Sequence, residues 1–424
     1  MRLLFSAALA IAIAWAPGAS AQDPTARRAR SEASSILTIQ EAVARALERG
    51  PASAAAAARL QAADANVDQA RALPNPELAV EGENFLGTGQ YRSFESLETT
   101  FSVSQTVEIG GKRGARVRAA EADRTAAQYG LSATELGLAK QVKFAFTEAV
   151  AAEAAVKLEE EGIRLAHEVE RSVRAQVEAG RETLVQLNRA EVALSQAELQ
   201  LDRARRRTAL ARDILGSLAG IDPATIQLES SWFEQLDPVG DLPSTDIDGS
   251  IDVLQSEAEV LRSRTKFEME RRQALPDLTV SAGVRRFSDS NDSAFVFGVS
   301  IPIPVFDRRQ GAIRRARAEI VAAEADLAAS RLGLTNVIAA VRSRIYTARD
   351  KAVALRTGVL PKAEQAFIFA EEGYRQGKFS YLDVLDAQRT LFQGRRELLD
   401  TLQTLHEARA ELERLTGTSS ERNG

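Results

Sequence analysis

The sequence predicts a mainly α-helical protein with a membrane β-barrel, in which a helix–strand–strand–long helix–helix unit occurs twice. Two very long stretches, 112–178 and 308–376, are almost free of proline and glycine and therefore predict long helices. Four shorter segments of about ten residues alternate apolar and polar side chains, which is typical of strands with one solvated face. Both features recur in the same order in each half, which indicates an internal duplication.

Composition excludes several classes of protein. The chain has 424 residues and no cysteine, so disulfide scaffolds, thiol nucleophiles, cysteine-based metal sites and a lipid-anchored cysteine are ruled out. Aromatic residues make up only 5% of the chain, as expected for long helices that pack through small side chains. A net charge of −5 argues against a nucleic-acid binder. The only histidines, His167 and His406, lack neighbouring ligands in sequence, and we expect no metal site, cofactor or enzyme activity.

Residues 1–21 are expected to be a secretory signal peptide. Arg2 precedes an apolar run, and the small residues Ala19 and Ala21 form a cleavage site after Ala21. The run is too short for a membrane anchor, which needs about 20 apolar residues. The sequence therefore predicts an exported protein.

The first unit is expected to cover residues 22–220. Thr38 and Glu41 form a capping box that begins a helix, and this helix is expected to continue to about Ala72, before Pro74. Its two strands are expected at about 77–85 and 99–109.

The second unit is expected to cover residues 251–417, after a linker at 221–250 that is rich in proline, glycine, serine and aspartate. Its strands are expected at about 277–287 and 294–306, and residues 418–424 form a C-terminal tail.

Glycine and proline are expected to end the second strand of each pair and so to mark a barrel-to-helix junction. These residues are Gly110 and Gly111 in the first unit and Pro302 and Pro304 in the second. The first long helix would then extend for roughly 100 Å at 1.5 Å per residue. The second should bend at Pro361.

The four strands favour a membrane-spanning assembly of several chains. Each has the length of a tilted transmembrane strand and one apolar face. An open sheet edge is forbidden in lipid, and four strands cannot close around a channel, so several copies would have to share one barrel. Three copies would supply about twelve strands, although closure alone does not fix the number of subunits. A helical protein with two soluble hairpins remains the alternative.

Two sets of motifs resemble the TolC-like outer-membrane factor family. The first is Gly373-Tyr374-Arg375-Gln376-Gly377 followed by Leu382-Asp383-Val384-Leu385-Asp386-Ala387-Gln388. The second resembles the heavy-metal, cobalt–zinc–cadmium-type branch and consists of residues 104–113 and 301–311. The resemblance covers essentially the whole mature chain.

This resemblance implies a homotrimer with a twelve-stranded β-barrel in the cell outer membrane, in contact with outer-membrane lipid, and a twelve-helix α-barrel in the periplasm. Its implied partners are a periplasmic adaptor (membrane-fusion) protein and an inner-membrane resistance–nodulation–division pump. The implied function is an exit duct for heavy-metal cations. Drug efflux and type I protein secretion are alternatives within the family, and a soluble periplasmic coiled-coil adaptor is the alternative from another class.

By the same resemblance, the channel constriction would lie at the periplasmic tip. Gly180 and Gly377 would form the tip turns, and Tyr374 would match a gate tyrosine. Asp383 and Asp386 would match the acids of the constriction, where three chains would form a ring that attracts cations. The competing interpretation is that these aspartates only complement a helix dipole.

The first-half tip departs from this pattern, since Gln186 and Asn188 stand where an acid is expected. The arginine runs at 203–207 and 314–317 are surrounded by acids on the same helices. We therefore expect these arginines to be solvated or to form interhelix ion pairs, with no nucleic acid as partner.

Overall fold

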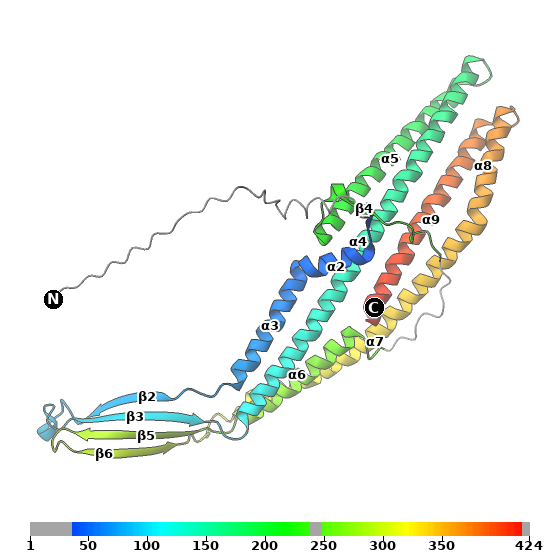
Figure 1. Ribbon diagram of the computed structural model, residues 1–424. Coiled ribbons are helices and arrows are strands. Elements are labelled where there is room, and N and C mark those ends of the chain that lie inside the picture. The colour runs from blue at the N-terminus through cyan, green and yellow to red at the C-terminus, as the bar shows by residue number, and fades with distance from the viewer. Residues whose placement is uncertain (1–35, 237–246, 418–424) are drawn as a thin grey trace, which may run out of the picture.

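A computed structural model describes residues 36–236 and 247–417, which form a narrow sheet that continues into a long layer of helices (Figure 1). The expected signal peptide and the C-terminal tail lie outside the described residues. Within the described ranges, no helix combines the length and the hydropathy needed to cross a membrane.

Both halves contain the predicted helix–strand–strand–long helix–helix order. The first half comprises β1 (Ile36–Leu37), α2 (Ile39–Arg49), α3 (Pro51–Arg71), β2 (Glu77–Glu83), the short 3₁₀ turn η1 (Gly89–Tyr91), β3 (Glu98–Val107), α4 (Lys112–Glu178) and α5 (Leu184–Ala219). The second half comprises η2 (Pro223–Thr225), β4 (Gln227–Leu228), α6 (Ile251–Gln273), β5 (Leu278–Phe287), β6 (Ser293–Ser300), α7 (Gln310–Ala354), η3 (Leu355–Val359), α8 (Leu360–Arg375) and α9 (Tyr381–Thr416).

The four long strands form one antiparallel sheet in the order β2-β3-β5-β6. The register places Val80, Phe101, Val284 and Phe295 in one row across all four strands. Since side chains alternate along a strand, this row and its neighbours give the sheet one continuous apolar face. The exposed members of that face are Leu78, Val80, Phe101, Val103, Val107, Val284, Phe295, Phe297 and Val299.

The opposite face of the sheet is polar and carries small side chains. Gly283 packs against the backbone of β3, and a Cβ at this position would collide with the Phe101 carbonyl oxygen. Arg285 links three strands on this face, because it lies 2.9 Å from Glu83 and 3.0 Å from Glu98, and also donates to Thr100. The sheet is therefore two-sided in the manner of a barrel with an apolar outside and a polar lumen.

Three predicted strands end earlier than expected. β2 ends at Glu83 and β3 at Val107, while β6 ends at Ser300, six residues before the predicted end at 306. The last prediction was wrong because Pro302 and Pro304 have no N–H to donate to a strand ladder.

The helix predicted to run from Thr38 to Ala72 is two helices. The capping box is present, since Thr38 Oγ1 accepts from Glu41 N–H at 3.1 Å and Glu41 accepts from Thr38 N–H. The chain then breaks at Gly50, which has an extended backbone, and Pro51 begins α3 at its first turn. Proline fits that position because its missing N–H has no intrahelical partner there.

The long helices follow the prediction closely. α4 is one continuous helix of 67 residues, about 100 Å long. Its counterpart is interrupted by the π-helical turn η3 directly before Pro361, which separates α7 from α8. Proline cannot donate an i to i−4 hydrogen bond, and this explains a widened turn at the predicted position.

The helices form one long layer, and the helices that neighbour α4 differ between its two ends (Figure 1). Near the sheet α4 packs against α3 and α6, and α6 packs against α7; farther away α4 packs against α5 and α9, and α9 against α8.

The predicted linker is partly folded: β4 pairs in parallel with β1, and Ile226 and Phe233 are buried in the adjoining core. The simple linker prediction was therefore incomplete.

Candidate functional site at the helical tips

The two helical hairpins, α4–α5 and α8–α9, end in turns with the same geometry (Figure 1). Gly180 and Gly377 have φ angles of +70° and +69°, which glycine adopts without steric cost. In the first turn Gly180 N–H donates to Val177; in the second, Gly377 N–H donates to Tyr374 at 2.9 Å. We call these turns and the first two turns of α5 and α9 the helical tips.

The shared geometry aligns the two tips residue by residue. Counting from Gly180 and Gly377, Gln186 is equivalent to Asp383, and Arg189 is equivalent to Asp386. Asn188 does not align with an acid, because its equivalent by the same count is the buried Leu385. One tip therefore carries two acids, and the other carries an amide and a guanidinium.

Asp383 and Asp386 have different surroundings although both are exposed. Asp383 accepts hydrogen bonds from the Ser380 N–H at 2.9 Å and from the Ser380 hydroxyl at 2.7 Å. These bonds lower the pKa of the Asp383 carboxyl and fix the first turn of α9. Asp386 lies one turn farther along α9, beyond this cap, and its backbone carbonyl accepts from Thr390. Asp383 thus has a structural role that Asp386 does not share.

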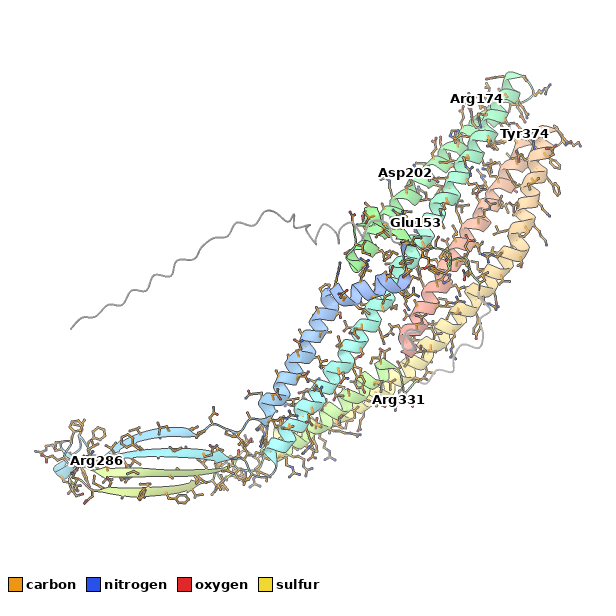
Figure 2. All side chains as sticks on the ribbon, in the orientation of Figure 1. Glu153, Arg174, Asp202, Arg286, Arg331 and Tyr374 are labelled. Carbon is orange, nitrogen blue, oxygen red and sulfur yellow. The ribbon has the colours of Figure 1, made fainter. Side chains whose placement is uncertain are left out.

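Tyr374 lies near the end of α8 and belongs to the buried core at the helical tips (Figure 2). Its ring is buried and packs 6.2 Å from the ring of Tyr381, measured between centroids. Burial, with a smaller contribution from Glu182, raises the pKa of Tyr374 to about 12. Its hydroxyl is buried and has no hydrogen-bond partner within the described part of the chain. The surrounding core consists of Val169, Val173, Ala190, Ala363, Phe367, Ala370, Val384, Leu385 and Leu391.

Gly373 is a tip residue that sequence reasoning missed. A Cβ at this position would collide with the Phe379 ring, and the Gly373 carbonyl accepts from Lys378 N–H at 2.8 Å. The Phe379 ring therefore packs directly on Gly373, in space that any larger residue would occupy. The Gly-Tyr-Arg-Gln-Gly motif contained this signal.

The junction between sheet and helices is built from ion pairs as well as from the predicted glycines. Gly110 and Gly111 have φ angles of +73° and +74°, and Leu275 fills the space beside Gly110. Lys112 is nearly buried and lies 2.7 Å from Asp277, which joins the start of α4 to the start of β5. Sequence reasoning missed this pair because its partners are far apart in the chain.

Two further ion pairs hold the same junction. Arg116 pairs with Glu108 through two hydrogen bonds. Arg309 lies 2.7 Å from Glu270 after the segment that contains Pro302 and Pro304. The predicted junction residues thus lie among ion pairs that connect α4, α6 and the start of α7 with the sheet.

The arginine run of α5 pairs with acids, as predicted. Arg205 lies 3.1 Å from Glu160, and Arg207 lies 2.7 Å from Glu148, both across the α4–α5 contact. The Arg207 guanidinium lowers the pKa of Glu148. These arginines are therefore held by interhelix ion pairs.

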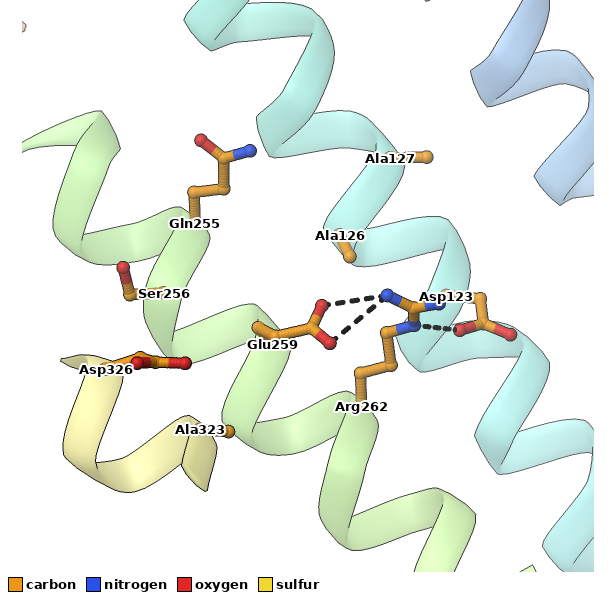
Figure 3. A pocket seen from close by; sticks show the side chains of 9 residues that line it. All are labelled: Asp123, Ala126, Ala127, Gln255, Ser256, Glu259, Arg262, Ala323 and Asp326. Atoms are coloured by element: carbon orange, nitrogen blue, oxygen red, sulfur yellow. Dashed lines mark hydrogen bonds and ion pairs between the residues drawn. The ribbon is translucent and has the colours of Figure 1, made fainter. Parts of the chain in front are cut away.

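A pocket between α4, α6 and α7 contains a charged cluster (Figure 3). Arg262 donates to Asp123 at 2.7 Å and to Glu259 at 2.9 Å. The carboxylates are thus engaged by a guanidinium that joins α4 to α6. In residues 36–236 and 247–417, no group of three or more His, Cys, Asp or Glu side chains could hold a metal ion.

The histidines lie on the long helices. His406 Nε2 is 2.9 Å from the Phe233 carbonyl oxygen, and its ring packs edge-on against Trp232. These contacts attach the folded part of the linker to α9. The backbone carbonyl of His167 accepts from Arg171 within α4. Neither histidine is brought into a ligand cluster.

Comparison with known proteins identifies the fold and the family. The sequence profile of the family described as outer membrane efflux protein matches residues 42–220 and 242–418. The cobalt-zinc-cadmium resistance protein CzcC of Cupriavidus metallidurans is 34% identical over 389 residues, which cover 91% of each chain. The nickel-cobalt-cadmium resistance protein NccC of Alcaligenes xylosoxydans is 32% identical, covering 68% of this chain and 65% of NccC.

Solved structures show the same architecture. A structure of CusC, described as forming a transmembrane channel, matches with a TM-score of 0.78 at 20% identity, covering 90% of this chain and 92% of that one. The outer membrane protein VceC of Vibrio cholerae matches with a TM-score of 0.76 at 22% identity, covering 90% of this chain and 97% of VceC. The alternative of a soluble periplasmic adaptor is not supported. The chain belongs to the outer membrane efflux protein family.

Proposed function

We propose that this protein is the outer-membrane exit duct of a tripartite resistance–nodulation–division system that exports heavy-metal cations. The observation that carries the cargo assignment is the 34% identity to a cobalt-zinc-cadmium resistance protein over 91% of both chains. The cation is a passing substrate in this proposal. The duct would conduct it without a tight binding site.

The proposed assembly is a homotrimer. β2 and β6 each have one strand neighbour, so both edges of the sheet carry free hydrogen-bonding groups. Lipid cannot satisfy such groups, and pairing β6 of one copy with β2 of the next removes every edge when the ring closes. Three copies give a barrel of about twelve strands, a size between small filled barrels and the larger porins. The helical layer is four helices wide near the sheet (α3, α4, α6 and α7), so three copies could close it into a ring of twelve helices on the periplasmic side.

The polar face of the sheet would line the lumen, and the helical tips would narrow it. In the closed ring, Asp383 and Asp386 of three chains would surround the axis, with the Tyr374 core behind them. Carboxylates at a constriction attract cations and repel anions. Because Asp383 is engaged by Ser380, Asp386 is the residue to which we assign most of this selectivity.

The proposed partners are a periplasmic adaptor and the inner-membrane pump that the adaptor joins to the helical tips. The exposed Leu184 and Val185, at the start of α5, offer the adaptor an apolar contact beside the tip turn. The pump would supply the energy, since a duct of this kind only conducts.

Metal sensitivity of a deletion strain tests the cargo. Growth would be compared across zinc, cobalt, cadmium, nickel and copper salts, with the wild-type gene restored as control. The proposal predicts sensitivity to at least one of these metals, reversed by the restored gene. Normal growth on all five, with sensitivity to drugs, would replace the metal cargo with drug efflux.

A further inference from the structure

The chain leaves the sheet through an apolar segment that is not a strand. In this segment, residues 301–306, Ile301, Ile303, Val305 and Phe306 are exposed, and prolines separate the first three. Phe306 is 93% exposed. We call residues 301–306 the rim segment. It continues the apolar row of β6, in which Phe295, Phe297 and Val299 point to the outer face of the sheet.

The rim segment supplies apolar height that β6 lacks. β6 has eight residues and falls one residue short of β5 at each end, because Ser293 pairs with Arg286 and Ser300 pairs with Thr279. At about 3.4 Å per residue and a tilt near 40°, such a strand rises about 21 Å, whereas a barrel carries an apolar band about 25 Å tall. β5 reaches that height with ten residues. Part of the shortfall lies at the helical end of β6, where the rim segment follows and continues the apolar side chains of the strand.

The rim segment has few free backbone N–H groups. Pro302 and Pro304 have no N–H groups, and the Val305 N–H donates to the Ile303 carbonyl at 2.9 Å. The Pro304 carbonyl accepts from Arg308 Nε at 3.2 Å. Irregular backbone is costly in a membrane because its polar groups lose water, and these features reduce that cost.

Charge follows directly after the apolar residues. Arg308 is exposed, and its bond to Pro304 holds its guanidinium beside the rim segment. The neighbouring Asp307 is engaged by the Arg309 N–H at 2.8 Å. Aromatic residues flank the apolar band of membrane barrels at both interfaces, and arginine binds phosphate well. At the opposite end of the sheet, Phe85 and Phe94 stack at 5.8 Å.

We propose that the rim segment lies in the periplasmic leaflet of the outer membrane and anchors the lower rim of the barrel to phospholipid. Phe306 and the backbone of the segment lie at the level of the headgroups, and the side chains of Ile301 and Ile303 reach the acyl chains. This placement rests on the proposed duct, since that duct puts the outer face of the sheet in lipid. It assigns the segment to lipid and not to a neighbouring copy of the chain.

Tryptophan placed on this surface tests the proposal. Phe306→Trp, with Ile303→Trp as a second variant, would be introduced into the full chain and reconstituted in vesicles of phosphatidylethanolamine and phosphatidylglycerol. Lipids brominated near the headgroup or near the acyl-chain end quench tryptophan at matching depths. Phe297→Trp, on the sheet, and Phe369→Trp, exposed on α8, are matched controls. The parent protein, whose Trp232 packs near Phe146 among the helices, gives the baseline.

The expected result is quenching of Phe306→Trp and Ile303→Trp, with the shallow bromines more effective at position 306. Phe297→Trp should favour the deeper bromines, and Phe369→Trp should not exceed the baseline. Quenching at position 297 without quenching at 303 and 306 would overturn the lipid anchor and leave the duct standing; blue-shifted emission would then indicate cover by a neighbouring copy. No quenching at any of the three positions would overturn the proposed duct as well.

Discussion

Glu159 of α4 makes one of the ion pairs that join the two helical hairpins of one chain, and among the carboxylates of these pairs it is deeply buried. Both of its oxygens accept from Arg396 of α9, at 2.6 Å from Nε and at 2.8 Å from Nη2. The Glu159 side chain is 7% exposed, whereas that of Arg396 is 45% exposed. The hydrogen bonds to this carboxylate raise the pKa of the Arg396 guanidinium above its ordinary value. We predict that Glu159→Gln destabilises the hairpin contact.

The size of this effect follows from the geometry. A hydrogen bond to a charged group contributes about 1.5–3 kcal/mol, and this pair makes two. Water can reach the freed Arg396, which reduces the loss, so we expect about 2 kcal/mol for Glu159→Gln. The adjacent Glu160 is a matched control, because it pairs with Arg205 at 3.1 Å and its side chain is 49% exposed. Glu160→Gln should cost about 0.5 kcal/mol, as exposed pairs do.

The assay is chemical denaturation of both variants in detergent, followed by the circular dichroism of the helices. We predict a clearly lower free energy of unfolding for Glu159→Gln and a value close to that of the parent for Glu160→Gln. Equal effects of the two substitutions would refute the reasoning, because burial would then not decide the strength of these pairs.

Two further predictions concern charge. Asp386→Asn should lower the cation selectivity of single channels in planar bilayers without lowering the free energy of unfolding. Asp383→Asn should lower selectivity and should also lower the free energy of unfolding by about 1 kcal/mol, because the α9 cap is lost. Unchanged cation selectivity in both variants would contradict the proposed acidic ring. The pKa of Glu148 lies below its ordinary value near 4.5 beside Arg207, so the stability it contributes is present above that value and is lost as pH falls through the lower, folded-state pKa. Acid unfolding of Glu148→Gln should therefore show a weaker pH dependence than that of the parent, and an identical curve would contradict this assignment.

The features that sequence predicted well are local and periodic. The extent of α4, the turns at Gly180 and Gly377 and the apolar row through Phe101 follow from patterns that a few neighbouring residues establish. The π-helical turn before Pro361 follows from one residue type. The duplication then supplied the order of the elements in both halves.

The features that sequence did not predict depend on contacts between distant segments or on short breaks. Lys112 and Asp277 meet only because two strands bring α4 and β5 together, and no local pattern marks them. The break at Gly50 divides an otherwise helical pattern. The equivalence of Arg189 and Asp386 was missed because the motif match was approximate; the shared geometry of the turns at Gly180 and Gly377 fixes the count.

The most direct test of the duct is native mass spectrometry of the protein extracted in detergent from purified outer membranes. We predict a complex of three chains: several copies are needed to leave no free strand edge in lipid, and the proposed barrel of about twelve strands takes three. A single chain as the dominant species in that extract would contradict the shared barrel.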